Sequence, residues 1–316
     1  MDTVVKRRSR MRRQSTGKRL ELTRRDLEIF KLLSRYRYLR STFIHAFVGG
    51  DRTKLIERLG TLYHEGGYLN RPAQQWQVVN ARYQPAVYEL DAKGAETIAL
   101  AGESTGPATW LGKAGIQRQF AHALTICDTL ASIELGVCEN PTLRFVAWKE
   151  ILGSPRCPED RRRSNRPFEF TVTAEGQSLR LIPDAVFGIE YKAEERKTYR
   201  FFALEVDRGT MPVRRAALRQ SSYRKKLIAY REVTARELYR LQYGLPNLFV
   251  LTLTTGDAHL KTIMTALGRL GADTRFFLFK ATSDLQLFGK PPPATSRMMW
   301  APWERHGHPP LTLSTP

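Results

Sequence analysis

The feature that most constrains the fold is a strand-like segment that ends in two acidic residues. In Glu205-Val206-Asp207 the two carboxylates are two residues apart, and apolar residues alternate with them from Phe202 through Leu204 to Val206. Successive side chains of an extended strand point to opposite faces of a sheet, so the apolar residues point into a core while the acids share the other face. The segment therefore predicts a strand with one buried face and two neighbouring carboxylates.

A third acid precedes this strand. Asp184 follows Pro183 one predicted strand earlier, so the chain can bring it beside Glu205 and Asp207. Mg²⁺ binds through one or two carboxylates together with water and phosphate oxygens, and such sites cleave phosphodiesters. The three acids thus predict a site for Mg²⁺ or Mn²⁺ next to a DNA phosphate. A second interpretation stays open, in which Asp184 caps a turn and the other two acids pair with Arg208, Arg214 or Arg215.

The charge of the chain points to a polyanionic partner. Its 316 residues include 51 Lys and Arg against 31 Asp and Glu, a formal net charge of +20. Such an excess attracts nucleic acid through counterion release. An anionic membrane competes as a partner, but we find no apolar run near the roughly 18–20 residues that span a bilayer and no signal-peptide pattern. We therefore expect a cytoplasmic protein that binds double-stranded DNA and no membrane.

The first twenty residues are strongly basic. Eight of the first nineteen are Lys or Arg, Asp2 is the single acid, and little is apolar. A segment of this composition cannot form a core, and we expect it to be disordered until it meets a phosphate backbone. We interpret residues 1–20 as a disordered DNA-binding arm; the alternative is a tail that only solubilises the chain. Its candidate DNA contacts are Arg7, Arg8, Arg12 and Arg13.

Residues 21–101 carry the pattern of a winged helix-turn-helix domain. Thr23 and Asp26 form a predicted capping box before a first helix, a second short helix covers about residues 41–48, and Asp51 caps a third. Strand-like segments, which we interpret as the strands of a wing, follow at residues 68–69, 76–79 and 87–90.

The third predicted helix has a basic outer face. Arg52 lies near its start, and Lys54 and Arg58 follow on the same side. A recognition helix presents such donors to the major groove of DNA, so these three residues are candidate contacts. Two alternatives stay open, because a basic face is often merely solvated and a winged helix can serve purely as a protein-interaction module.

Turn-forming residues at 102–109 predict a linker to a second domain at residues 110–285, with an irregular tail at 286–316. The second domain begins with a long predicted helix at residues 110–136. Further segments follow in this order: strands at 143–148, 168–173, 179–189 and 198–206, a helix at 213–243, a strand at 248–253, a helix at 258–270 and a strand at 276–279. The late alternation implies a parallel crossover, so we expect an α+β protein with a mixed sheet flanked by helices.

A basic stretch follows the acidic strand. Eight basic residues and no acid lie between Arg208 and Arg231. A helix here would place Arg215, Arg219 and Lys226 beside the carboxylates, where they could hold a phosphate backbone. The alternative is a solvated helix face that balances the nearby acids.

These motifs resemble the restriction-endonuclease-like, or PD-(D/E)xK, nuclease core. More specifically, residues 20–280 resemble the replication-relaxation family of plasmid and integrative-element proteins, in which a winged helix precedes three sequence blocks. In this chain the blocks are Pro183-Asp184, Glu205-Val206-Asp207-Arg208-Gly209-Thr210 and Lys226-Leu227-Ile228-Ala229-Tyr230.

The resemblance implies catalytic roles for four residues. Asp184 and Glu205 would be metal ligands together with Asp207, which stands where an active nuclease has its catalytic lysine. An aspartate cannot offer positive charge to a scissile phosphate, and Lys226 would restore that charge from the following helix. His122, on the long predicted helix, could also reach the site, but a single histidine in an apolar stripe is more often a core residue with its hydrogen bonds satisfied.

The resemblance also implies a function. We expect a DNA-binding protein of a mobile genetic element that acts in plasmid replication, relaxation or conjugative mobilisation, with metal-dependent nicking at the four residues. A relaxase or replication protein would be its protein partner, and a homodimer stays open. The alternatives are an accessory factor with an inactive nuclease fold and a winged-helix transcriptional regulator.

Overall fold

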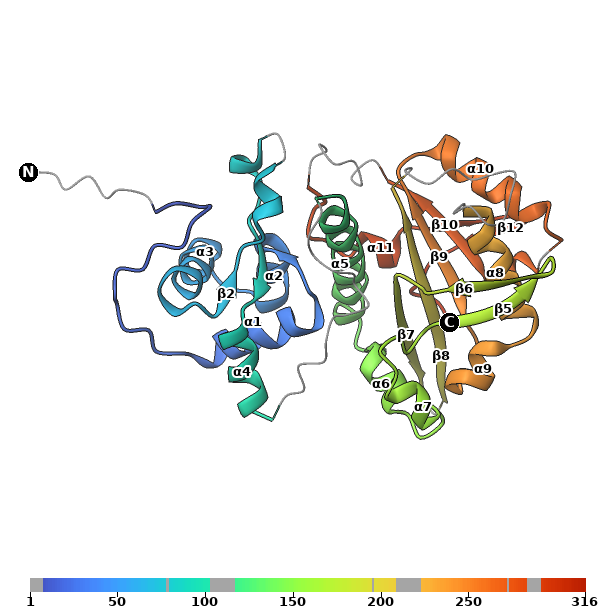
Figure 1. Cartoon of the computed structure of the whole chain (residues 1–316), viewed down its shortest axis with the longest axis horizontal. Coiled ribbons are helices and arrows are strands. Elements are labelled where there is room, and N and C mark those ends of the chain that lie inside the picture. Colours follow the sequence, from blue (N-terminus) through green and yellow to red (C-terminus); the bar gives the residue numbers. More distant parts are fainter. Residues whose placement is uncertain are drawn as a thin grey trace, which may run out of the picture. The chain divides into compact units, whose positions relative to one another are not determined.

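The computed structural model describes residues 8–77, 80–102, 117–194, 196–208, 223–271, 273–282 and 291–316. Backbone contacts divide the chain into two compact units, Met1–Ala131 with Lys290–Thr295 and Ser132–Gly289 with Ser296–Pro316 (Figure 1). The boundary lies within helix α5 (Gln117–Cys138). The sequence predicts the boundary at residues 102–109, of which 103–109 lie outside the described residues.

The first unit combines helices with a small sheet. Its elements are α1 (Arg24–Arg35), β1 (Leu39–Arg40), α2 (Ser41–Val48), α3 (Arg52–Thr61), the π-helical turn η1 (Leu62–Gly66), β2 (Leu69–Asn70), β3 (Val87–Leu90) and α4 (Ala92–Leu100). Strand β3 pairs antiparallel with β1 and β2, which gives the strand order β1-β3-β2. This order of helices and strands is compatible with the predicted winged helix-turn-helix.

Local capping fixes where the helices of this unit begin. Thr23 accepts a hydrogen bond from the Asp26 amide and donates its own amide to the Asp26 carboxylate at 2.7 Å, which confirms the predicted capping box of α1. Asp51 caps α3 by accepting from the Lys54 amide at 2.8 Å. The apolar faces of the three helices then meet in a core of Ile29, Phe30, Leu33, Phe43, Ile44, Leu55 and Leu59.

The predicted wing differs from the sequence expectation in one segment. Residues 76–79 are predicted as strand, but Ala73–Gln77 forms a 3₁₀ helix, η2, and residues 78–79 lie outside the described residues. The reason is the buried side chain of Gln75, which donates to the Val87 carbonyl at 2.9 Å and accepts from the Val87 amide at 2.8 Å. The side-chain amide of Gln75 thus makes the two hydrogen bonds with Val87 that the backbone of a neighbouring strand would otherwise make.

The described part of the basic arm is not free. The Glu65 carboxylate accepts hydrogen bonds from the Thr16 amide at 2.8 Å and the Ser15 hydroxyl at 2.9 Å, and it pairs with Arg8 at 2.6 Å. Arg13 pairs with Asp91 at 2.7 Å. Two acids of the first unit thus contact residues of the arm in this structure, and its disorder before DNA binding stays a prediction.

A seven-stranded mixed sheet forms the centre of the second unit, in the order β12-β11-β10-β9-β8-β7-β4 (Figure 1). Its strands are β4 (Leu143–Val146), β7 (Ala185–Ala193), β8 (Arg196–Asp207), β9 (Phe249–Thr254), β10 (Phe277–Ala281), β11 (Trp303–Arg305) and β12 (His308–Leu311). Strand β7 is antiparallel to β4 and β8, whereas β8, β9 and β10 are parallel.

Helices connect the parallel strands. After β8 the chain forms α8 (Tyr223–Ala235) and α9 (Leu238–Tyr243), and after β9 it forms α10 (Asp257–Gly268). The sequence predicts one helix over residues 213–243, but Glu237 has φ +47° and separates α8 from α9. The α+β class is confirmed, and the order of strands and helices is compatible with the predicted restriction-endonuclease-like core.

Two predicted strands do not join the central sheet. β5 (Phe170–Ala174) and β6 (Gln177–Leu181) form a separate antiparallel hairpin. The sequence predicts that the segment of β6 runs on into β7, but Ile182, Pro183 and Asp184 interrupt the pairing. The strand is interrupted at Pro183 because proline has no amide hydrogen to donate to a neighbouring strand. Helices α6 (Trp148–Gly153) and α7 (Glu159–Arg162) lie between β4 and the hairpin.

The end of the chain belongs to the sheet. The prediction of an irregular tail at 286–316 is wrong for residues 297–311, which form α11 (Arg297–Trp300), β11 and β12. Trp303 is fully buried, and its indole donates to the Met298 carbonyl at 3.0 Å. The short, Pro-rich strands lack the alternation from which a strand is recognised, because β12 is His308–Leu311 with two prolines.

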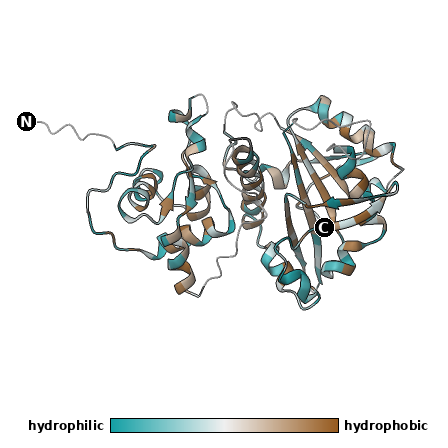
Figure 2. Ribbon diagram, viewed as in Figure 1, coloured by the Kyte–Doolittle hydropathy of each residue, from teal (hydrophilic) through white to brown (hydrophobic). Residues whose placement is uncertain are grey.

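Helix α5 is unusually apolar (Figure 2). By length and composition Gln119–Cys138 could cross a membrane, which corrects the expectation that no apolar run approaches that length. Most of its most apolar stretch, 83%, is however buried inside the protein. A buried core helix passes the same test of composition.

Candidate acidic site and basic surfaces

Pro183 and Asp184 place one acid at the start of β7 and against the end of β8. The Asp184 amide donates to the Leu204 carbonyl at 3.0 Å, and one Asp184 carboxylate oxygen accepts from the Val206 amide at 2.8 Å. Ala185 pairs with Leu204 in the antiparallel register, so Asp184 lies opposite Glu205. Because partners in an antiparallel pair share a face, the structure brings these two predicted acids together.

Glu205 lies at the centre of the cluster. Its side chain is 1% exposed, and Lys226 of α8 forms an ion pair with one carboxylate oxygen while the Tyr230 hydroxyl donates to the other at 2.6 Å. Burial raises the pKa of Glu205 above its ordinary value, and the charge of Asp184 adds to the rise while Lys226 and Tyr230 oppose it. The predicted approach of Lys226 to the acids is thus realised through α8.

All three acids stabilise the positive charge of Lys226. Burial favours its neutral amine, but the carboxylates of Glu205, Asp184 and Asp207 together raise the pKa of Lys226. Its ammonium therefore stays charged at neutral pH. Asp207 supplies no positive charge to this site, and the ammonium of Lys226 supplies one beside the acids.

Asp207 has a partner that the sequence analysis missed. His259, in the first turn of α10, contacts the Asp207 carboxylate through Nε2 at 2.8 Å. Parallel strands β8 and β9 end at the same edge, where Asp207 pairs with Thr254, and His259 follows five residues later. Its place just after a parallel strand is the signal that could have found it. The sequence analysis considered His122 instead, which lies on the part of α5 that belongs to the first unit.

Two buried side chains fix α8 over this edge of the sheet. The Tyr223 hydroxyl lies 2.7 Å from the Thr252 hydroxyl, and Thr252 is the register partner of Glu205 on β9. Burial raises the pKa of Tyr223 and the nearby acids raise it further, so this phenol remains a neutral hydrogen-bonding group. The first turn of α8 is therefore anchored beside the acids.

The cluster offers carboxylate oxygens, which Mg²⁺ and Mn²⁺ prefer. Both oxygens of Glu205, however, already bind Lys226 and Tyr230, and Asp207 contacts His259. Among the described residues, no three His, Cys, Asp or Glu side chains are grouped so that they could hold a metal ion. In this arrangement the carboxylates of Glu205 and Asp207 are engaged in contacts within the protein, and the metal site stays a prediction.

The predicted DNA contacts of α3 divide into two kinds. Arg52 and Lys54 are exposed in the first turn. Arg58 instead forms two hydrogen bonds with Asp26 of α1, at 2.9 and 2.5 Å, and donates to the Glu21 carbonyl at 2.6 Å. Its guanidinium holds α3 against α1 in this structure, which gives Arg58 a structural role, and its contact with DNA stays a prediction.

Replacing Arg58 with glutamine should lower the free energy of unfolding of the first unit by about 2–3 kcal/mol. The Asp26 side chain is 1% exposed and would lose its charged partner, whereas Arg58 itself is 31% exposed, which moderates the loss. Hydrogen exchange of the α1 and α3 amides measures this local stability. Arg52→Gln on the same helix is the matched control and should change it little; equal exchange in both variants would refute a structural role for Arg58.

Of the other predicted basic contacts, two form ion pairs within the protein, one is exposed, and three lie outside the described residues. Arg8 and Arg13 pair with Glu65 and Asp91, and Arg12 is exposed. Residues 7, 215 and 219, predicted as the DNA contacts Arg7, Arg215 and Arg219, lie outside the described residues.

Comparison with protein families gives one match. The model of the replication-relaxation family matches residues 30–245, a range that includes the second half of α1, all of α2 and α3, the three acids and Lys226. Comparisons with curated proteins and with solved structures found no match.

Proposed function

The chain belongs to the replication-relaxation family, and on this basis we propose that it is a DNA-binding protein that acts in replication, relaxation or conjugative mobilisation of a mobile genetic element. One observation carries the proposal: Arg52 and Lys54 are exposed in the first turn of a capped helix, within a unit whose order of helices and strands suits a winged helix. A recognition helix contacts bases through its N-terminal residues. The formal net charge of +20 supports the same partner, double-stranded DNA.

The direct test is binding of the full chain to a labelled DNA duplex at increasing salt, followed by fluorescence anisotropy. We expect the logarithm of the binding constant to fall linearly with the logarithm of salt concentration, with a slope of about −0.9 for each phosphate contacted. Binding that is absent at low salt would refute the proposal. Enrichment of bound duplexes from a random pool then identifies the sequence preference.

A second candidate function is DNA nicking at the cluster of Asp184, Glu205, Asp207 and Lys226. It is favoured by the ammonium of Lys226, which lies beside Glu205 and supplies the positive charge that Asp207 cannot. On a scissile phosphate this ammonium would stabilise developing negative charge once it exchanged Glu205 for the phosphate oxygen. The role of His259 would be to orient Asp207.

Supercoiled plasmid incubated with the full chain and Mg²⁺ or Mn²⁺ tests this candidate. We expect open-circular product with the natural sequence and at least about a hundredfold less with Asp184→Asn or Glu205→Gln, since either change removes a cluster charge. Glu96→Gln, an exposed acid on α4, is the matched control. Nicking that persists in both cluster variants would assign it elsewhere, and no nicking by the natural sequence would leave an accessory DNA-binding protein.

The same proposal accommodates a protein partner. An accessory factor would dock a relaxase or replication protein onto DNA, and a transcriptional regulator would bind a palindromic site as a homodimer. A footprint and a measurement of oligomeric state on that DNA separate these two roles.

A further inference from the structure

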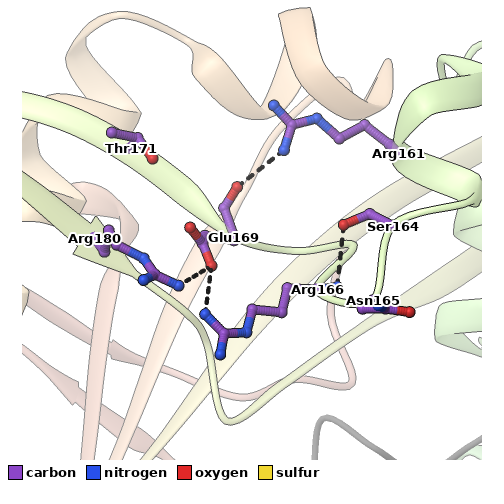
Figure 3. Close-up of a pocket in the computed structure, with 7 residues that line it drawn as sticks. All are labelled: Arg161, Ser164, Asn165, Arg166, Glu169, Thr171 and Arg180. Atoms are coloured by element: carbon purple, nitrogen blue, oxygen red, sulfur yellow. Dashed lines mark hydrogen bonds and ion pairs between the residues drawn. The ribbon is translucent and has the colours of Figure 1, made fainter.

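The second unit has a polar pocket away from the acid cluster residues. Its volume is about 730 Å³, and the described residues that line it are Arg161, Ser164, Asn165, Arg166, Glu169, Thr171 and Arg180 (Figure 3). They come from the end of α7, from the connection to the hairpin and from both hairpin strands. None of these lining residues is apolar or aromatic, so the pocket is suited to a charged ligand rather than to a base or an apolar anchor.

Two guanidinium groups contact the Glu169 carboxylate, and a third contacts the backbone carbonyl of the same residue. Arg180 donates to Glu169 at 2.6 Å, Arg166 lies 3.5 Å from the same oxygen, and Arg161 donates to the Glu169 carbonyl at 3.2 Å (Figure 3). Three positive charges against one negative charge leave the lining residues with a net charge of +2. The hydrogen bond and charge of Arg180 lower the pKa of Glu169, so its carboxylate is ionised at neutral pH and acts as the internal counterion.

The strands of the hairpin direct Thr171 and Arg180 toward solvent. Its inward residues are buried, whereas Thr171 and Arg180 are exposed register partners on the outer face. The side chains of Arg166 and Arg180 are 59% and 54% exposed, so a ligand can reach both. Ion pairs as exposed as these contribute little to stability, which leaves their guanidinium groups available to a stronger anion.

The neighbouring arginines do not share this position. The sequence has three consecutive arginines, of which Arg162 donates to the Cys157 and Ser154 carbonyls and Arg163 pairs with Glu159. Arg161 alone of the three lines the pocket. Arg161 thus lines the pocket and Arg162 stabilises the loop. Arg163 lies outside the pocket and can serve as a control.

We propose that this pocket binds the phosphate backbone of nucleic acid, with Arg166 and Arg180 exchanging Glu169 for a phosphodiester oxygen. A guanidinium matches two phosphate oxygens at once, and hydroxyl and amide donors such as Ser164, Asn165 and Thr171 are typical of backbone contacts. The inference rests on the proposed DNA-binding function and adds to it a second contact surface that reads no sequence. It predicts that Glu169 competes with DNA.

Anisotropy of a short labelled duplex with the full chain tests the pocket. Arg166→Gln/Arg180→Gln should weaken binding about tenfold at low salt and reduce the magnitude of the salt slope by about 1–2. Arg163→Gln/Arg275→Gln removes two charges from exposed ion pairs outside the pocket and should leave the slope unchanged. Glu169→Gln should tighten binding, because it removes the competing carboxylate and retains the side-chain shape.

Three other outcomes would overturn the pocket, its assigned ligand or the proposed function. Equal slopes for the pocket and control variants, with intact binding by the natural sequence, would overturn the pocket and leave the proposed function standing. The same experiment with a labelled mononucleotide identifies the source of the phosphate: arginine-dependent binding of the nucleotide without an effect on duplex would replace nucleic acid as the ligand. Failure of the natural sequence to bind any duplex would refute the proposed function itself, and the pocket inference with it.

Discussion

Replacing Lys226 with methionine should lower the free energy of unfolding of the second unit by about 3–4 kcal/mol. The change removes the ammonium that pairs with Glu205 and leaves a carboxyl group that is 1% exposed, to which the Tyr230 hydroxyl still donates. A charge deprived of its partner in a buried site costs far more than the pair contributes. Urea unfolding, with hydrogen exchange of the β8 amides as the local measure, records the loss.

The pH dependence of this loss follows from the sign of the pKa shift. Burial raises the pKa of Glu205 in the folded protein, and removal of Lys226 raises it further. Below the unfolded pKa of about 4.3 the carboxyl is protonated in both states and the variant loses little. As pH rises above that value, the unfolded chain releases its proton while the folded one retains it, so stability falls. The natural sequence shares this fall, because its folded Glu205 also keeps its proton up to a pKa of about 7. The difference between natural sequence and variant should therefore widen only as pH rises above about 7.

A double variant separates charge from packing. In Lys226→Met/Glu205→Gln the buried charge is gone while Tyr230 can still donate to the side-chain amide oxygen, so most of the lost stability should return. Lys261→Met, an exposed lysine on α10, controls for the substitution itself. If the double variant were as unstable as the single one, lost packing would explain the effect and the ion-pair network would have no energetic role.

The acid cluster was predictable because it depends on short-range rules. Alternation places Glu205 and Asp207 on one face, and an antiparallel neighbour brings Asp184 opposite Glu205. Helical spacing then allows Lys226 and Tyr230, four residues apart, to reach the same carboxylate. The first helices were predictable for a similar reason, since capping residues such as Thr23 and Asp51 lie within three residues of the amides they bind.

Contacts between distant segments were not predictable in this way. His259 reaches Asp207 only because β8 and β9 are parallel neighbours, a property of the folded sheet. The ion pair of Arg58 with Asp26 could not be predicted either, because the two residues lie 32 positions apart in the sequence. The contacts of the arm with Glu65 and Asp91 are of the same kind, since both acids are remote from it in sequence. Charge patterns identify the basic residues but not which acids neutralise them.

Replacing both Arg52 and Lys54 with glutamine should weaken duplex binding by about a hundredfold and reduce the magnitude of the salt slope by about 2. Both residues are exposed in the first turn of α3, whereas Arg58 is tied to Asp26. Glu57 is also exposed on α3, so the favourable charge of this helix is concentrated at its N-terminal turn. That turn is the part of a recognition helix that approaches base edges.

The single variants distinguish base contacts from phosphate contacts. A residue that reads a base should lose sequence preference in a selection from random duplexes, while a residue that contacts phosphate should weaken all sequences alike and change only the salt slope. Arg24→Gln/Lys261→Gln removes two exposed charges from α1 and α10 and is the matched control. If this control weakened binding as much as Arg52→Gln/Lys54→Gln, the attraction would come from the net charge of the chain, and α3 would not be a recognition helix.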